Sequence, residues 1–253
     1  MASTPDSDAV RRQLHQRLRS LSAAGVDWLP QGPALEVEAT TPLFPADEIV
    51  EATGSAAPAT EDRRIALAQL ADEVRLCTRC PELCSTRTQT VFGDGQAGAE
   101  LCFVGEAPGE DEDRQGLPFV GAAGQLLNKI IEACGMKRSE VYIMNVLRCR
   151  PPRNRTPLPN EAANCRGFFE RQIELVGPKF ICALGGCAAA NLLGSTLSIG
   201  KLRGRFHDYR GIPVMVTYHP AYLLPHRNPA AKREVWQDMQ MLLKKMGREI
   251  PPR

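Results

Sequence analysis

The sequence has no hydrophobic run long enough to cross a membrane and no recognisable export signal. The longest weakly polar stretch, residues 180–194, is 15 residues long and contains Asn191, whereas a membrane-spanning helix needs about 20 apolar residues. The N-terminal residues MASTPD lack the basic start and apolar stretch of a secretory signal. We therefore expect a cytoplasmic protein with no membrane span.

The chain also lacks internal repeats and the composition of a fibrous or disordered protein. Of its 253 residues, 43% are hydrophobic and 24% are charged, which is typical of a globular protein that buries one sizeable core or two small ones. The cysteine count is odd at nine. Without a signal peptide, an odd count argues against a disulfide scaffold and favours metal or redox chemistry.

Charge is divided unevenly along the chain. Residues 1–64 hold 6 basic and 10 acidic side chains, a net charge of −4, and residues 65–253 hold 25 and 19, a net charge of +6. The basic part is compatible with a polyanionic partner such as a nucleic acid. A charge of this size is equally compatible with an ordinary solvated surface.

The first 64 residues differ in pattern from the rest and are predicted to form a flexible N-terminal extension. Residues 7–24 carry apolar side chains at spacings of three and four, which predicts a short amphipathic helix. This helix either docks on a protein partner or packs on its own domain. Residues 30–62 are rich in proline, alanine and acidic residues, as tethers are. We place the domain boundary between residues 64 and 65.

From residue 65 onward, strand and helix patterns alternate. This order predicts an α/β fold with a central, mostly parallel sheet covered by helices on both faces. The working groups of such folds lie on loops beyond the carboxyl ends of the strands. The expected strands are residues 101–104, 141–147 and 180–184 with a hairpin over 204–209 and 212–218, and the expected helices are residues 122–134, 160–176 and 229–246, after one that ends near Cys77.

Four cysteines have the spacing of metal ligands. Cys77 and Cys80 form a C-x2-C pair, and Cys149 and Cys165 form a second pair with a wider separation. Together they can enclose one tetrahedral thiolate centre, either zinc or an iron-sulfur cluster. Cys84 is a nearby spare ligand. Flanking arginines can neutralise the thiolates, and they are Arg75, Arg79, Arg148, Arg150 and Arg166.

Three loop motifs complete the pattern: GEAPGEDED at residues 105–113, GLPFVG at 116–121, and HPAYLL at 219–224. Together with the four cysteines, they strongly resemble a family 4 uracil-DNA glycosylase, the iron-sulfur type of that superfamily, over residues 74–243. The resemblance implies a three-layer α/β/α sandwich, a four-iron four-sulfur cluster on the four cysteines, and excision of uracil from DNA in base excision repair.

The resemblance also implies roles for single residues. A uracil must leave the duplex to be reached, and Phe119 matches the pocket residue that stacks on the base. Asn145 can donate to a carbonyl and accept from the neighbouring ring N–H, which suits uracil and not cytosine. His219 matches the histidine that stabilises the uracil anion. Further residues of the predicted uracil site are Gly105, Ala107 and Asn154.

Ala107 stands where related families carry an acidic or amide side chain. The carboxylate that assists the attacking water must therefore come from another position. Glu112 is our first choice and Glu106 our second. Leu223 matches the wedge that fills the space left by the extruded base, with Leu224 as runner-up. Candidate phosphate contacts are Arg153, Arg155, Lys201, Arg203, Arg205 and Arg227.

Two absences refine the expected chemistry. The loop motifs contain no lysine that could form an imine, so we expect a monofunctional glycosylase without lyase activity. The loop at residues 150–156 contains no histidine, which one branch of the superfamily uses to link itself to DNA, so we expect multiple turnover by a monomer. The alternative is a non-catalytic DNA-binding module that carries a metal or an iron-sulfur cluster.

Overall fold

The computed structural model describes residues 60–224 and 229–252. The predicted helix at residues 7–24, for which a protein partner was one of two expectations, lies outside this range. Arg227 lies outside it as well. Helix α2 (Thr60–Arg75) already packs against α6 (Pro159–Val176), and Arg171 on α6 pairs with Glu73 on α2 at 2.6 Å. Helix α2 therefore runs across the predicted boundary between residues 64 and 65.

A five-stranded sheet lies at the centre of the molecule, with the strand order β2-β1-β3-β5-β4. The first four strands in that order are parallel, and β4 runs antiparallel to β5 at one edge. The strands are β1 (Leu101–Gly105), β2 (Tyr142–Asn145), β3 (Phe180–Leu184), β4 (Phe206–Tyr209) and β5 (Ile212–Thr217).

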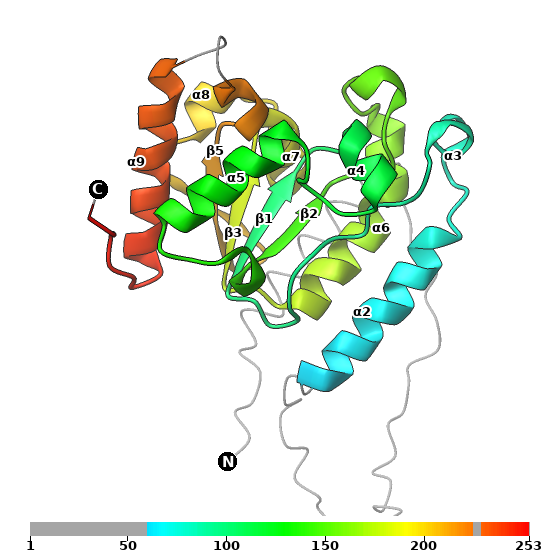
Figure 1. Ribbon diagram of the computed structural model, residues 1–253, viewed down its shortest axis with the longest axis horizontal. Helices are drawn as coiled ribbons and strands as arrows, with labels where there is room; N and C mark the ends of the chain where they lie inside the picture. The colour runs from blue at the N-terminus through cyan, green and yellow to red at the C-terminus, as the bar shows by residue number, and fades with distance from the viewer. Residues whose placement is uncertain (1–59, 225–228, 253) are drawn as a thin grey trace, which may run out of the picture. The chain divides into compact units, whose positions relative to one another are not determined.

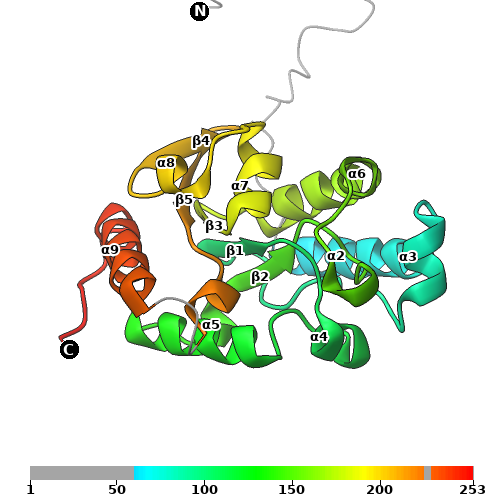
Figure 2. The same ribbon diagram turned by 90° about the horizontal axis from the view of Figure 1, so that it is seen from above.

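Helices cover both faces of this sheet (Figures 1 and 2). Side chains alternate along a strand, so Cys102 and Val104 of β1 pack into one core cluster, whereas Leu101 and Phe103 pack into another. The first cluster includes α2, α6, α7 (Gly186–Leu193) and α8 (Ile199–Leu202), and the second includes α5 (Ala122–Ala133) and α9 (Pro229–Lys245). The predicted three-layer α/β/α sandwich is confirmed.

Several short helices were not predicted from the sequence. They are α3 (Pro81–Thr86), α4 (Glu110–Gln115), α7, α8 and the 3-10 turns η1 (Arg138–Glu140), η2 (Pro152–Asn154) and η3 (Pro220–Leu223). The acidic run at residues 110–113 forms the first turn of α4, where negative charge is favourable because it faces the positive end of the helix dipole.

The strand register places the functional motifs at one edge. Gly105 pairs with Asn145, and Leu184 pairs with Thr217, so the carboxyl ends of the four parallel strands lie in one row. The loops that follow β1, β2 and β5 begin there. Among the described residues, no helix has both the length and the apolar character that a bilayer span requires.

Candidate active site

A cavity of about 340 Å³ opens at this edge of the sheet. Its walls come from the loops after β1, β2 and β5, which are far apart in the sequence. Seven of the eight residues predicted for catalysis or uracil binding line it, and the eighth, Gly105, packs directly beneath two of them. The seven are Glu106, Ala107, Glu112, Phe119, Asn145, Asn154 and His219.

The Phe119 ring is held in place by close backbone packing. A Cβ atom added at Gly105 would lie 2.5 Å from Cζ of Phe119, and one added at Gly124 would lie 1.9 Å from its carbonyl oxygen. Phe119 itself has a φ of +53°, which is costly for an aromatic residue. Arg138 stabilises this turn, because its guanidinium donates to the carbonyls of Pro118 at 2.6 Å and Phe119 at 3.2 Å.

Asn145 ends β2 with a side chain that is only 2% exposed. Its Oδ1 is buried, and no donor in the described part of the chain reaches it. Buried polar atoms are nearly always hydrogen-bonded in native proteins, so an unpaired amide oxygen at a cavity wall is a group available to a ligand.

His219 follows β5 and has a defined tautomer. Its Nδ1 accepts the Ala221 backbone N–H at 3.1 Å, so the ring proton of the neutral imidazole must sit on Nε2. Burial lowers the pKa of His219 to about 4, against a smaller opposing effect of the Glu112 charge. The ring lies 5.5 Å from that of Phe119, centroid to centroid. At neutral pH this residue is therefore an uncharged N–H donor.

Glu112 is occupied by the protein backbone. Its Oε1 accepts the N–H groups of Val120 at 2.8 Å and Gly121 at 2.9 Å, and its Oε2 accepts that of Gly109 at 3.1 Å. The carboxylate thus joins the start of α4 to the loop that carries Phe119. A group tied to three N–H donors is suited to positioning that loop rather than to moving a proton.

Glu106 offers the less restrained carboxylate. It lines the cavity next to Ala107, and no hydrogen bond or ion pair engages its side chain within the described residues. Burial raises its pKa above the usual value. The order of preference inferred from the sequence, Glu112 before Glu106, therefore does not fit this geometry.

The loop after β2 bends sharply at the rim of the cavity. Arg153 and Asn154 both have positive φ values, 55° and 54°. Oδ1 of Asn154 accepts from Nε of Arg150 at 2.7 Å, and Arg150 also pairs with Glu110 on α4 at 3.1 Å. Asn154 is therefore a half-restrained polar group at the entrance.

Three of the four predicted ligand cysteines pack in the same cluster as Ala107, and Cys77 packs against a different one. Cys149 and Cys165 share one buried cluster, against which Cys80 and Ala107 pack. Arg87 joins Cys77 to this group, since it donates to the Cys77 carbonyl at 2.8 Å and to Sγ of Cys149 at 3.0 Å.

Four thiols are a donor set that suits a thiolate-bound centre, either zinc or an iron-sulfur cluster. Within the described residues, no three His, Cys, Asp or Glu side chains converge on one point. In a four-iron cluster each thiolate binds a different iron, so the sulfur atoms stand further apart. The sulfurs also receive hydrogen bonds suited to thiolates, from Arg87 to Cys149 and from Asn164 to Cys80 at 3.4 Å.

Comparisons with known proteins agree with this geometry. A family model of the uracil DNA glycosylase superfamily matches residues 92–240. The type-4 uracil-DNA glycosylase of Thermotoga maritima is 44% identical over 173 residues, which are 68% of this chain and 90% of the relative. That of Archaeoglobus fulgidus is 38% identical over 187 residues, 71% of this chain and 92% of the relative. The chain belongs to the type-4 uracil-DNA glycosylases. The family resemblance read from the sequence is thereby confirmed.

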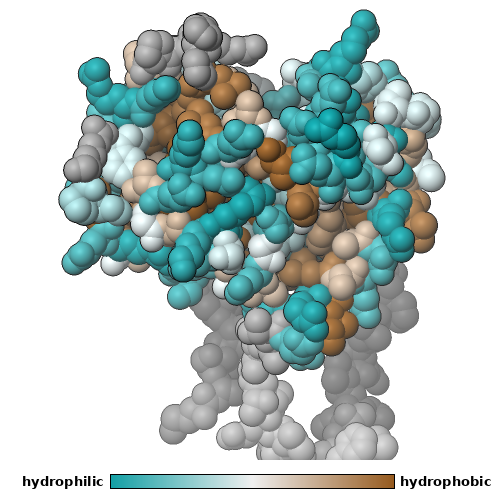
Figure 3. Space-filling view, viewed as in Figure 1, coloured by the Kyte–Doolittle hydropathy of each residue, from teal (hydrophilic) through white to brown (hydrophobic). Residues whose placement is uncertain are grey.

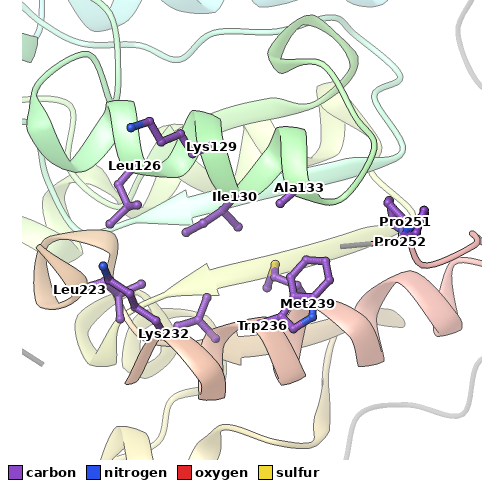
Figure 4. A pocket seen from close by; sticks show the side chains of 11 residues that line it. Leu126, Lys129, Ile130, Ala133, Leu223, Lys232, Trp236, Met239, Pro251 and Pro252 are labelled. Atoms are coloured by element: carbon purple, nitrogen blue, oxygen red, sulfur yellow. The ribbon is translucent and has the colours of Figure 1, made fainter. Parts of the chain in front are cut away.

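One predicted residue of this glycosylase is not placed as its role requires. Leu223 is 2% exposed and turns into an apolar groove between α5 and α9, on the side of Leu126 (Figure 4). Apolar surface gathers over the same region in Figure 3. A preformed wedge projects from the surface, and Leu223 does not do so in this structure. Leu224 is more exposed.

Two of the candidate phosphate contacts of the glycosylase are already paired. Arg155 binds Glu82 at 2.8 Å and Glu161 at 2.6 Å, and Arg203 binds the buried Asp238 at 3.1 Å. The candidates that remain exposed are Arg153, Lys201 and Arg205.

Sequence reasoning missed two residues that shape the site of this glycosylase, and it missed the backbone contacts of Glu112. Arg138 and Arg87 lie outside every motif, and their long reach to backbone carbonyls and a thiolate leaves no local signal. The positioning contacts of Glu112 depend on the fold of two loops. Only a carboxylate three residues after Gly109, in a capping arrangement, could have suggested one of them.

Proposed function

We propose that this protein removes uracil from DNA by hydrolysing the N-glycosidic bond of deoxyuridine. The products are free uracil and an abasic site in an uncut strand. One observation carries the proposal: the Phe119 ring, an unpaired amide oxygen of Asn145 and the neutral N–H of His219 line one cavity. Relatives named for this activity, which align over most of their length, support it.

Base recognition is assigned to Asn145 and Phe119. The everted base stacks on the Phe119 ring, and the Asn145 amide donates to a carbonyl oxygen and accepts from the adjacent ring N–H. Cytosine presents the opposite donor and acceptor order at that edge. It would leave a buried polar pair unsatisfied, which costs binding free energy.

Leaving-group stabilisation is assigned to His219. Cleavage of the bond moves negative charge onto the departing base, and Nε2–H donates a hydrogen bond to its 2-oxygen as that charge develops. Because Nδ1 is held by the Ala221 N–H, the ring needs no reorientation. Its low pKa keeps it a neutral donor instead of an acid.

Attack on the sugar is assigned to Glu106, with Glu112 as a positioning residue. A carboxylate near the sugar opposes its developing positive charge and orients the attacking water. Glu106 has both oxygens available, whereas Glu112 holds the Phe119 loop through three backbone N–H groups.

The proposed cofactor is a four-iron four-sulfur cluster on Cys77, Cys80, Cys149 and Cys165. When bound, it supplies a covalent cross-link between the end of α2, the loop after β2 and helix α6. The loop after β2 carries Asn154 and directly follows Asn145. The four thiolates therefore restrain the position of Asn145, which recognises the base. The proposed role of the centre is structural.

DNA binding is assigned to exposed groups around the entrance. Arg153, Lys201 and Arg205 are the proposed phosphate contacts, which position the duplex without reading its sequence. We assign the wedge to the tip of the loop after His219, with Leu224 ahead of the buried Leu223. No lysine lines the described cavity, so the proposed enzyme is monofunctional and works without imine chemistry. Multiple turnover is proposed because the loop at residues 150–156 contains no histidine.

The test uses cluster-loaded full-length protein and an oligonucleotide that contains one uracil. Hot alkali cuts the strand at abasic sites, so we expect cleavage at the uracil and none at a cytosine or thymine in the same context. His219→Ala should lower the rate about 10²–10³-fold. His207→Ala is the matched control. His207 lies on β4, outside the cavity, and its side chain is hydrogen-bonded to the Leu202 carbonyl of α8.

The rival function is a DNA-binding module that uses the same fold without catalysis. It predicts stoichiometric binding of uracil-containing DNA without any alkali-labile product. If cluster-loaded wild-type protein bound the oligonucleotide and released no base, the rival would replace the glycosylase.

A further inference from the structure

Arg148 is a buried cation without a matching carboxylate. It is 1% exposed, the largest fully buried side chain among the described residues. One guanidinium nitrogen, Nη1, donates to the backbone carbonyl of Asn145. The other two, Nε and Nη2, are buried without any hydrogen-bond partner, and no described carboxylate forms an ion pair with this residue.

A buried charge in this state is costly, so a nearby anion is expected. Four ionisable groups act on the Arg148 charge: Cys165, Tyr142, Cys102 and Cys149. Two of these four are proposed cluster ligands that lie against Arg148 itself: Cys149 is the next residue along the chain, and the Cys165 thiol is hydrogen-bonded to the Arg148 backbone. A thiol that binds a metal loses its proton.

We propose that Arg148 is the buried counter-charge of the thiolate-bound cluster and links it to the uracil-reading end of β2 at Asn145. The inference rests on the cluster of the proposed function. It adds to that function a positioning residue that lies between the cofactor and Asn145, the residue that recognises the base. Arg148 acts through Cys149, Cys165 and the Asn145 carbonyl, and it does not touch the substrate.

The geometry separates Arg148 from the other arginines near the cysteines. Arg166 follows Cys165 directly, yet its guanidinium pairs with Glu170 on the helix surface at 2.8 Å. Arg87 donates to Cys149 from a half-buried position. Arg148 alone among these three is fully enclosed and has unused donors.

The experiment compares Arg148→Met, Arg148→Lys and the matched control Arg166→Met with wild-type protein. Each full-length protein is purified without oxygen, and its iron content, visible absorbance and circular dichroism are recorded. The lifetime of the visible absorbance is then measured in the presence of an iron chelator, and the midpoint potential of the cluster by voltammetry.

We expect Arg148→Met to lose the cluster about 10- to 100-fold faster than wild type, the usual effect of removing an outer-sphere partner of a metal site. Its midpoint potential should fall, because a lost positive charge disfavours the added electron. Arg148→Lys keeps the charge and should stay near wild type in both measurements, as should Arg166→Met.

Two outcomes would overturn the inference. One is a folded Arg148→Met protein with wild-type cluster lifetime and potential. The other is Arg148→Lys losing the cluster as fast as Arg148→Met, which would assign the effect to shape instead of charge. If Arg148→Met does not fold, Arg148→Gln takes its place with the same expectations. A wild-type protein that never acquires iron would instead contradict the cofactor of the proposed function.

Discussion

The state of His219 follows from its immediate surroundings. The Ala221 N–H occupies Nδ1 and fixes the tautomer, while burial disfavours the charged ring. The carboxylates divide in the same way. Glu112 is held by backbone donors, and Glu106 stays available beside the cavity. Local contacts of this kind decide which motif residue does chemistry and which positions another.

The lowered pKa of His219 predicts how activity depends on pH. Folding lowers this pKa from 6.5 to about 4, so the imidazole is neutral in the folded protein above about pH 5. We expect the single-turnover rate to show no inflection near 6.5 from this group. The folded state also binds fewer protons than the unfolded chain between these two values, so stability due to His219 falls as pH drops through that window. An NMR titration of the ring checks this, and a midpoint near 6.5 would contradict it.

The two carboxylates should separate rate from stability. Glu106→Gln removes the charge facing the sugar, and we expect the single-turnover rate to fall about 10²–10⁴-fold with little change in the free energy of unfolding. Glu112→Gln places an N–H₂ group against backbone donors and should lower the free energy of unfolding by about 1–3 kcal/mol. Single-turnover kinetics and urea denaturation measure both. The reverse pattern would restore Glu112 as the catalytic carboxylate.

At the scale of elements, the ends of the parallel strands assemble the site. Gly105 ends β1 opposite Asn145 of β2, and its missing side chain leaves room for both Asn145 and the Phe119 ring. The sequence predicted the strands and the long helices, because apolar periodicity reflects burial. It did not predict α4 or α7, since an acidic run and a small-residue run carry no helical period of their own.

Gly105→Ala tests the close packing under the cavity. An added Cβ would lie 2.4 Å from Oδ1 of Asn145 and 2.5 Å from Cζ of Phe119, so both must shift. We expect kcat/KM for uracil excision to fall about 100-fold, the scale of an ångström misplacement in an active site. Gly167→Ala is the control, because its Cβ on α6 meets no atom within 4 Å. Equal activity of both variants would contradict the packing argument.

At the scale of the whole molecule, the sheet brings together loops that are distant in sequence, and the proposed cysteine centre would join them further. Candidate site residues and ligand cysteines could be proposed from the sequence because most of them lie in short motifs. Their mutual arrangement could not, since the burial of Leu223 between α5 and α9 and the pairing of Arg155 with Glu161 are tertiary contacts. Long arginine side chains reach partners that no local pattern specifies.

The most direct test of the central claim counts free uracil released per protein molecule. Cluster-loaded, full-length protein is mixed with an excess of uracil-containing DNA, and the released base is quantified by chromatography over time. We predict several uracil molecules per protein, together with an equal number of abasic sites. Tight binding of the DNA with no free base above the level of a protein-free control would contradict the account.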